Sequence, residues 1–261
     1  MKITLDLTKS LEENASFYFE KAKQAKQKAE RARKALKTTK INLEKAKLDL
    51  ENKKTQLDKK PKVKRKKEWF EKFRWFYTSE DFLVIAGRDA TTNEIIIKKH
   101  TEKDDVVFHT EVSGSPFGVI KTEKKKPGKI SLEETAQFIG CYSKVWKGGQ
   151  TALDVFYVNP EQVTKEAPSG EYIGKGSFMI YGKKNIMPVA LKLYIGIMDD
   201  GKVMSGPLSA VKKHCKKYKE IIQGNDKASN IAKSLKKEFE TDDVDEIVRI
   251  IPVGSKLKKE R

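Results

Sequence analysis

The sequence contains little that could cross-link the chain or hold a metal ion. Only two cysteines, Cys141 and Cys215, occur among its 261 residues, and they give neither a disulfide framework nor the spacing of a metal site. The three histidines, His100, His109 and His214, stand apart from other potential ligands. We therefore expect no metal, no cofactor and a reducing compartment.

Long hydrophobic runs are also missing. No apolar stretch approaches the roughly 20 residues that cross a bilayer, and no signal-peptide pattern opens the chain. These absences predict a cytoplasmic protein that does not engage a membrane. A P-loop is missing as well, because Gly170–Ser177 reads GEYIGKGS, with the wrong spacing and a glycine after the lysine.

Acidic residues are too few to balance the basic ones. The formal net charge is +18, and the isoelectric point is near 9.6. Residues 1–67 alone carry 22 Lys and Arg against 9 Asp and Glu. A charge surplus of this size indicates a polyanionic partner, either nucleic acid or a membrane surface, and of these two we expect nucleic acid.

The basic N-terminal quarter has a regular apolar pattern. Its apolar positions alternate at spacings of four and three, and no Gly or Pro interrupts the segment before Pro61. This heptad seam predicts one long helix of a coiled coil, capped by Thr8 or Ser10, whose partner helix comes from another chain or from a missing part of the protein. The apolar seam residues are Leu11, Ala15, Tyr18, Ala22, Ala25, Ala29, Ala32, Leu36, Leu43, Ala46, Leu50 and Leu57, and only Thr39 and Lys53 interrupt the series.

The remaining chain alternates short apolar runs with turn residues and three helical patterns, which begin near Ser131, Pro207 and Lys227. We expect an α+β fold with a mostly antiparallel sheet, divided into residues 1–67, 68–200 and 201–261, the last a helical extension with a basic tail. The local predictions are a hairpin joining Phe82–Ala86 to Ile95–Ile97, a helix from Pro207 to about Ile222, and a strand at Glu246–Ile251.

Several polar groups are candidates for contact with RNA. Arg88, Asp89, Asn93 and Glu94 surround the expected hairpin turn, where they either pin the turn or present a guanidinium to phosphate. His109 follows an apolar strand and is either structural or a general base. Exposed lysines are expected at Lys124, Lys125, Lys126, Lys183 and Lys184. The aromatic cluster from Trp69 to Tyr77 either packs in a core or stacks on bases.

Three strings of the sequence resemble the C-terminal RNA-binding domain of the NFACT family. They are EKFRWFYTSEDFLVIAGRDATTNE, DDVVFHTEVSG and PSGEYIGKGSFMIYGKKN, and the opening ITLDLTKSLEENASFYFEKAKQAKQKAE resembles the returning coiled-coil helix of that family. The residues that match the family signature are Gly87, Arg88, Asp89, Asn93, Glu94, His109, Gly114, Pro168, Gly170, Glu171, Gly176, Lys183 and Lys184.

The resemblance implies a ribosome quality control factor. Members bind large ribosomal subunits that hold a stalled peptidyl-tRNA, recruit tRNA, and support tailing of the nascent chain through an N-terminal domain that this chain lacks. The sequence departs from the family pattern at Thr110–Ser113, where a second histidine is replaced, and at Thr91 and Thr92, where glutamines are usual. These departures favour binding to large-subunit RNA and tRNA over catalysis.

Two alternatives remain at the level of sequence. The chain could be a coiled-coil scaffold whose basic face serves only solvation. It could also be a fibronectin-binding-like protein without specific RNA recognition, as some bacterial relatives are described, although the missing export signal disfavours that role.

Overall fold

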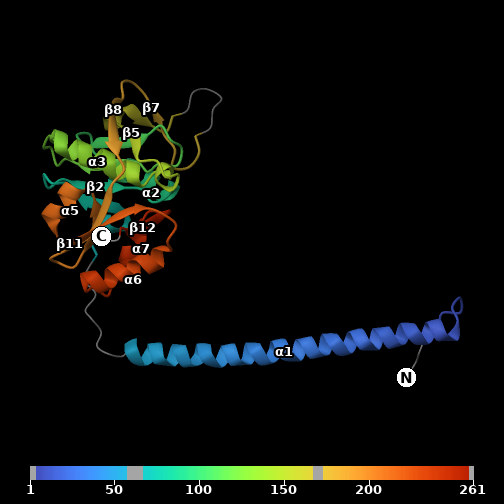
Figure 1. The fold of residues 1–261 in the computed structure, drawn as a ribbon. Helices are drawn as coiled ribbons and strands as arrows, with labels where there is room; N and C mark the ends of the chain where they lie inside the picture. Colours follow the sequence, from blue (N-terminus) through green and yellow to red (C-terminus); the bar gives the residue numbers. More distant parts are fainter. Residues whose placement is uncertain (1–3, 58–66, 167–172, 259–261) are drawn as a thin grey trace. The chain divides into compact units, whose positions relative to one another are not determined.

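The computed structural model describes residues 4–57, 67–166 and 173–258, and it divides into two compact units, Met1–Lys66 and Lys67–Arg261. The first unit is built on α1 (Leu11–Leu57), a single helix shown in Figure 1. The Ser10 hydroxyl accepts from the Glu13 N–H at 3.2 Å, and the Glu13 carboxylate accepts from the Ser10 N–H at 2.8 Å. This reciprocal capping box fixes where the helix begins.

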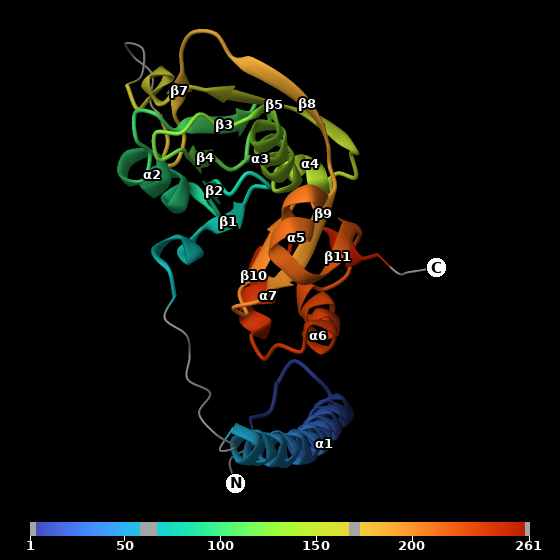
Figure 2. The same cartoon turned by 90° about the vertical axis from the view of Figure 1, so that its left-hand side faces the viewer.

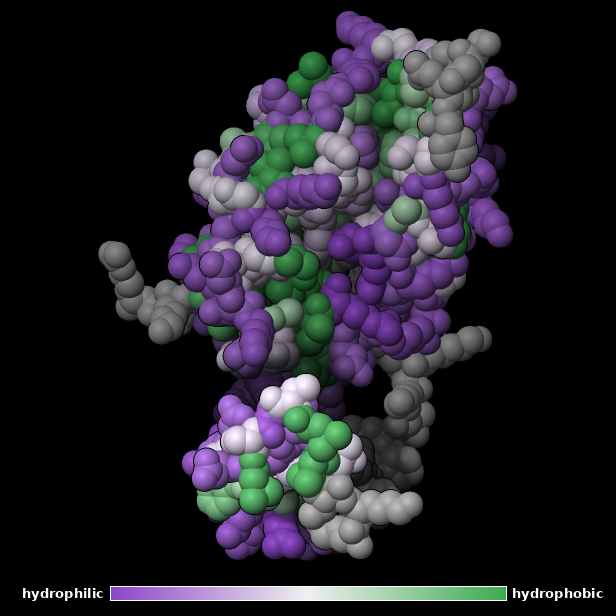
Figure 3. Space-filling view, turned by 90° about the vertical axis from the view of Figure 1, so that its right-hand side faces the viewer, coloured by the Kyte–Doolittle hydropathy of each residue, from purple (hydrophilic) through white to green (hydrophobic). Residues whose placement is uncertain are grey.

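The seam of α1 is open to solvent within its own unit. Leu11, Leu36 and Leu43 are 78%, 58% and 55% exposed. Hydrophobic residues accordingly reach the surface of this unit in the view of Figure 3. Leu50 and Leu57 belong to the helix, but their side chains lie outside the described part of the structure. A leucine stripe of this kind is stabilised only when a second helix covers it.

The second unit contains a six-stranded antiparallel sheet with the order β1-β2-β4-β3-β5-β8. Its strands are β1 (Arg74–Tyr77), β2 (Leu83–Ala86), β3 (Val106–Thr110), β4 (Gly118–Lys121), β5 (Ala152–Val158) and β8 (Asn185–Ala190). Helix α3 (Lys129–Cys141) packs on this sheet through Phe138 and Ile139, which are fully buried. The Phe138 ring lies 4.6 Å from that of Phe76 on β1.

A four-stranded sheet with the order β10-β9-β11-β12 completes the unit. Its strands are β9 (Leu193–Met198), β10 (Val203–Gly206), β11 (Cys215–Gln223) and β12 (Ser255–Leu257). Figure 2 shows the surrounding helices, α5 (Leu208–His214), α6 (Ala228–Phe239) and α7 (Val244–Ile250). Strand β9 lies before residue 201, whereas β10, β11 and β12 lie after it. The four-stranded sheet therefore crosses the boundary that the sequence predicted between residues 200 and 201.

Short elements precede β1 or lie between strands of the six-stranded sheet. They are η1 (Trp69–Lys72), α2 (Ala90–Lys99), α4 (Lys144–Lys147), η2 (Pro160–Gln162), β6 (Val163–Thr164) and β7 (Met179–Ile180), and the last two pair with each other. Tyr142, which ends α3, joins the sheets by hydrogen bonds to the Ser205 hydroxyl and to the carbonyl oxygen of Ile250. The Trp146 indole N–H donates to the Ser255 hydroxyl at 3.0 Å. These bonds satisfy the polar tips of two buried aromatic side chains and tie the sheets into one core.

The α+β fold with antiparallel sheets and a long N-terminal helix is confirmed, and the aromatic cluster packs as a core, since Phe70, Phe73, Trp75 and Phe76 are buried. The predicted hairpin is wrong. Residues 95–97 lie inside helix α2.

The reason is a capping signal that outweighs the β-branched residues. The Asp89 carboxylate accepts from the Thr92 N–H at 2.8 Å, and the Thr92 hydroxyl accepts from the Asp89 N–H at 2.9 Å. This reciprocal cap starts a helix directly after β2. Within this helix, Ile96 is the residue of the run 95–97 that is buried.

Three predictions in the C-terminal segment are also wrong. The helix after Pro207 ends at His214, and the following residues form strand β11, which lies against β9 and β12. The segment predicted as a last strand is helix α7, because the Asp243 carboxylate accepts from the Glu246 N–H at 3.2 Å and caps it. Ser255–Leu257, predicted to be part of a basic tail, forms strand β12.

Candidate functional site

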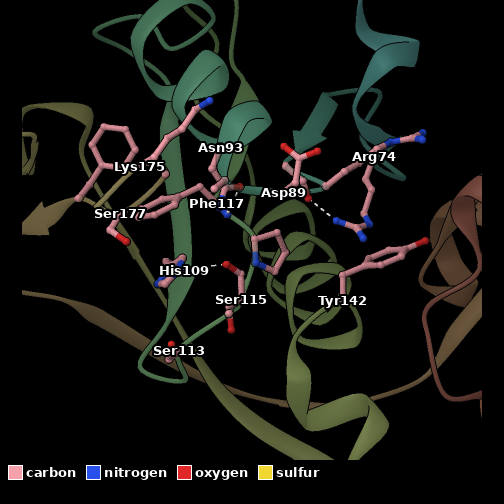
Figure 4. Close-up of a pocket in the computed structure, with 17 residues that line it drawn as sticks. Arg74, Asp89, Asn93, His109, Ser113, Ser115, Phe117, Tyr142, Lys175 and Ser177 are labelled. Atoms are coloured by element: carbon pink, nitrogen blue, oxygen red, sulfur yellow. Dashed lines mark hydrogen bonds between the residues drawn. The ribbon is translucent and has the colours of Figure 1, made fainter. Parts of the chain in front are cut away.

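A cavity of about 490 Å³ opens where β1, the start of α2 and the loop between β3 and β4 meet the segment 175–178. In Figure 4, Lys175 and Ser177 lie on one side of it and Arg74 and Tyr142 on the other, with His109 and Ser115 between them. The lining residues are Arg74, Gly87, Arg88, Asp89, Ala90, Asn93, His109, Ser113, Gly114, Ser115, Pro116, Phe117, Tyr142, Lys175, Gly176, Ser177 and Phe178.

Arg74 supplies one guanidinium group to this cavity. It is the first residue of β1, and its Nη1 donates to the carbonyl oxygen of Gly87, as Figure 4 shows. The guanidinium carbon lies 4.6 Å from the centre of the Tyr142 ring, in the geometry of a cation–π contact. Its Nε is buried and has no hydrogen-bond acceptor among the residues that the structure describes. Burial lowers the pKa of Arg74, but an arginine keeps its charge in proteins.

Arg88 supplies the second guanidinium group. Its Nη2 donates to the carbonyl oxygen of Phe73 at 3.0 Å, and its buried Nε also lacks an acceptor within the described part of the chain. Burial lowers the pKa of Arg88, and the nearby positive charge of Arg249 lowers it further. Arg88 therefore lies beside η1, where a backbone carbonyl oxygen holds its side chain. The sequence had predicted instead that Arg88 stands at an exposed hairpin tip.

The carboxylates near these arginines are engaged with other groups. Asp89 accepts from Thr92, and Glu246 binds Lys67 and Arg249. Neither Arg74 nor Arg88 forms an ion pair with a carboxylate among residues 4–57, 67–166 and 173–258. Two partly buried positive charges thus stand without a paired anion, an arrangement that costs free energy unless an anionic ligand enters.

Asn93 and Gly87 shape the rim of the cavity. The Asn93 side chain is 9% exposed, and its Oδ1 accepts from the Phe117 N–H at 3.2 Å, which joins α2 to the start of β4. A Cβ atom at Gly87 would lie 1.8 Å from that same oxygen. The sequence Gly87-Arg88-Asp89 with Asn93 is therefore required for the turn from β2 into α2 as well as for the cavity.

Glu94 holds the opposite wall in place. Its carboxylate pairs with Lys98 at 2.7 Å and with Lys165 at 3.5 Å, and accepts from the Gly176 N–H at 3.0 Å. The hydrogen bond from Lys98, followed by that from Gly176, lowers the pKa of Glu94 to about 2. A charge at Glu94 thus anchors the segment that carries Lys175.

His109 lies in the cavity wall as a packed side chain. Its ring stacks on Phe117 with centroids 4.1 Å apart, and its Nε2 lies 3.3 Å from the carbonyl oxygen of Ser115. Burial lowers the pKa of His109, so the imidazole is neutral at neutral pH. This environment fits a positioning and hydrogen-bonding role.

The lysines predicted from the sequence lie elsewhere. Lys124, Lys125 and Lys126 are exposed in the turn after β4, and none of them lines the cavity. Lys183 is exposed, whereas Lys184 pairs with Glu111 at 2.7 Å and lies over the Phe156 ring. Pro168, Gly170, Glu171 and residues 62–66 fall outside the described residues.

Sequence reasoning missed Arg74, Tyr142 and Lys175 as parts of the site. A signal for Arg74 exists, because a single charge begins the strand Arg-Trp-Phe-Tyr, whose two central residues are buried. Tyr142 comes from a distant helix end and carries no local signal. Among the described residues, no group of three or more His, Cys, Asp or Glu side chains is placed to hold a metal ion. No described helix is long and apolar enough to cross a membrane.

Comparison with known proteins places this cavity in a recognised domain. Residues 72–182 match the family described as the NFACT protein RNA binding domain. The chain is 41% identical to the archaeal Rqc2 homolog aRqcH of Methanocaldococcus jannaschii over 200 residues, which are 74% of this chain and 30% of that protein.

Animal relatives match over a shorter stretch. The chain is 42% identical to the ribosome quality control complex subunit NEMF of Homo sapiens over 125 residues, which are 48% of this chain and 12% of that protein. A solved C-terminal part of the fibronectin/fibrinogen-binding protein from Streptococcus suis is 16% identical, with a TM-score of 0.39 over 50% of this chain and 48% of that one. The chain thus spans 30% or less of the length of these full-length relatives.

Proposed function

Since this chain belongs to the NFACT family, we propose that it is the RNA- and ribosome-binding part of a cytoplasmic ribosome quality control factor. Its partners are large-subunit RNA and tRNA, and the complex that it engages is a large subunit that holds a stalled peptidyl-tRNA. The names of the archaeal and animal relatives support this assignment. The seam of α1 binds a partner coiled-coil helix in the same assembly.

The observation that carries the proposal is the pair of guanidinium groups at Arg74 and Arg88, neither of which has an ion-pair partner among the described residues. Every residue that lines their cavity lies within the matched stretch 72–182. Guanidinium groups bind phosphate through paired N–H donors, and the buried Nε atoms of both arginines are donors without an acceptor. Phosphate is the anion that RNA offers at every nucleotide.

We also propose that this part of the protein binds without catalysing a reaction. The histidine in the cavity wall is stacked on Phe117 and sits at hydrogen-bond distance from a backbone oxygen. A general base must instead reach the proton that it removes. The carboxylate of Asp89 is likewise committed to capping α2.

The test is co-sedimentation with purified large ribosomal subunits, with and without peptidyl-tRNA. Arg74→Gln with Arg88→Gln removes both charges, and the expected result is a loss of affinity of about tenfold or more, the range for specific contacts. Arg88→Lys should restore only part of the affinity, because an ammonium lacks the planar fork.

The matched control is Lys233→Gln with Lys237→Gln. It removes two exposed charges from one face of α6, away from the cavity. Equal loss of affinity in both double variants would show that binding follows net charge alone, as a scaffold with a basic surface predicts.

A further inference from the structure

A second cavity adjoins the first one and is shared between the matched domain and the C-terminal segment. Its volume is about 580 Å³, and it has Arg74, Gly114 and Tyr142 in common with the first. On its far side lie Pro252 and Val253, which follow α7 and fall outside residues 72–182. The guanidinium of Arg74 therefore stands on the boundary between two cavities.

The chemistry of the second cavity differs from that of the first. Its lining includes the aromatic Tyr142 and the apolar Pro252 and Val253, and Val253 is 77% exposed. It also includes Lys144 and Lys147, which are exposed and have no carboxylate partner among the described residues. Apolar groups beside cationic ones complement a nucleobase that is attached to phosphates.

The walls of the second cavity are fixed by contacts within the core. Tyr142 is held by Ser205 and the Ile250 carbonyl, and Trp146 binds Ser255. A Cβ atom at Gly254, where φ is +84°, would lie 3.0 Å from the Cα of Lys147. The turn that carries Val253 is thus packed directly against α4, so the cavity does not depend on a free loop.

Gly114 lines both cavities and lies directly against the Lys144 side chain. Its φ is +86°, and a Cβ atom there would lie 2.4 Å from the Lys144 side chain. Glycine therefore allows the Lys144 stem to cross the backbone at the point where the cavities meet.

From this arrangement we propose that the two cavities bind consecutive nucleotides of a single RNA strand, with the phosphate that links them on Arg74. The inference rests on the proposed function and adds two statements to it. The ligand is unpaired RNA, because each cavity must admit a base that has left its stack. The C-terminal segment contributes one wall of the binding path through Pro252 and Val253.

Fluorescence anisotropy with the full chain tests both statements. The probes are a ten-nucleotide oligouridylate and a ten-base-pair RNA duplex of mixed sequence at the same low salt concentration. We expect the single strand to bind at least tenfold more tightly than the duplex. Lys144→Gln with Lys147→Gln should weaken single-strand binding about tenfold, while Lys233→Gln with Lys237→Gln should leave it nearly unchanged.

Val253→Asn tests the apolar wall without a change in charge. Because Val253 is exposed, the variant should fold normally, and single-strand affinity should fall several-fold. The inference is overturned if the Lys144/Lys147 and Val253 variants bind like the wild type while Arg74→Gln with Arg88→Gln still weakens binding, or if the duplex binds as tightly as the single strand. In both of those cases the proposed function stands. If the wild-type chain binds neither probe nor the large subunit, the proposed function itself fails.

Discussion

At the scale of single residues, the candidate site consists of side chains that also stabilise the fold. Arg88 binds a backbone oxygen of Phe73 and still leaves its Nε without an acceptor. Asn93 was a candidate for contact with RNA, and its oxygen is used to hold the Phe117 N–H. The sequence pattern Gly87-Arg88-Asp89 with Asn93 marks the right place in the chain, but it cannot separate these two kinds of role.

Gly87 gives the sharpest residue-level prediction. Gly87→Ala places a Cβ atom 1.8 Å from the Asn93 oxygen, so the bond to Phe117 must break or the turn must move. We expect a loss of about 1–3 kcal/mol in the free energy of unfolding. Urea titration followed by tryptophan fluorescence measures it, since all three tryptophans lie in the second unit.

The matched control for that variant is Gly174→Ala. A Cβ atom at Gly174 meets nothing within 4 Å, so its substitution should change stability by only a few tenths of a kcal/mol. Equal effects of the two substitutions would contradict the close-approach explanation.

Arg74 shows why part of the site could not be predicted from the sequence. Its partners Gly87 and Tyr142 are 13 and 68 residues away along the chain, and only the folded sheet brings them together. An isolated charge in an apolar strand is a recognisable signal, but its counterpart on α3 is not visible in any local pattern.

At the scale of elements, local capping decided several assignments. The heptad pattern predicted α1 correctly because it is long and continuous, and the Ser10–Glu13 box marks its start. Shorter segments were ambiguous. The β-branched residues of α2 favour a strand, but the cap formed by Asp89 makes the segment a helix. Strand β11 depends on pairing with β9, which is a tertiary contact and leaves no local pattern in the sequence.

The segment that carries Lys175 gives a pH-dependent prediction. The pKa of Glu94 is lowered to about 2 in the folded state, from 4.5. Its stabilising contacts are therefore fully present above pH 4.5 and are lost as the pH falls toward 2. An NMR titration of the Glu94 carboxyl and of the Gly176 amide should show one shared midpoint near pH 2.

The same titration has an internal control. Lys98→Gln should raise the midpoint, because the Lys98 hydrogen bond is the largest cause of the shift. A wild-type midpoint near 4.5 would show that Glu94 does not anchor the segment.

The exposed seam of α1 predicts association through this element. Leu36→Asp with Leu43→Asp should abolish self-association of the chain in sedimentation velocity, because it places two charges on the seam. Ile41→Asp is the control, since Ile41 is 46% exposed and lies off the heptad positions. A wild-type chain that stays monomeric at high concentration would count against a pairing role for the seam.

At the scale of the whole molecule, charge and architecture point to the same partner. The surplus of +18 is the feature that the sequence reveals most directly, and Arg74 and Arg88 are where we propose that a polyanion binds. The α+β class and the coiled-coil helix followed from patterns in the chain. The cavities did not, because they are lined by residues from elements that are distant in sequence.

The most direct test of the central claim is the salt dependence of the affinity of the chain for RNA. The logarithm of the association constant should fall linearly with the logarithm of the salt concentration, with a slope of about −0.7 to −0.9 for each phosphate contact. Arg74→Gln with Arg88→Gln should make that slope shallower by about the same amount for each contact that is lost. An affinity that does not change with salt concentration, or a slope that the double variant leaves unchanged, would contradict the account.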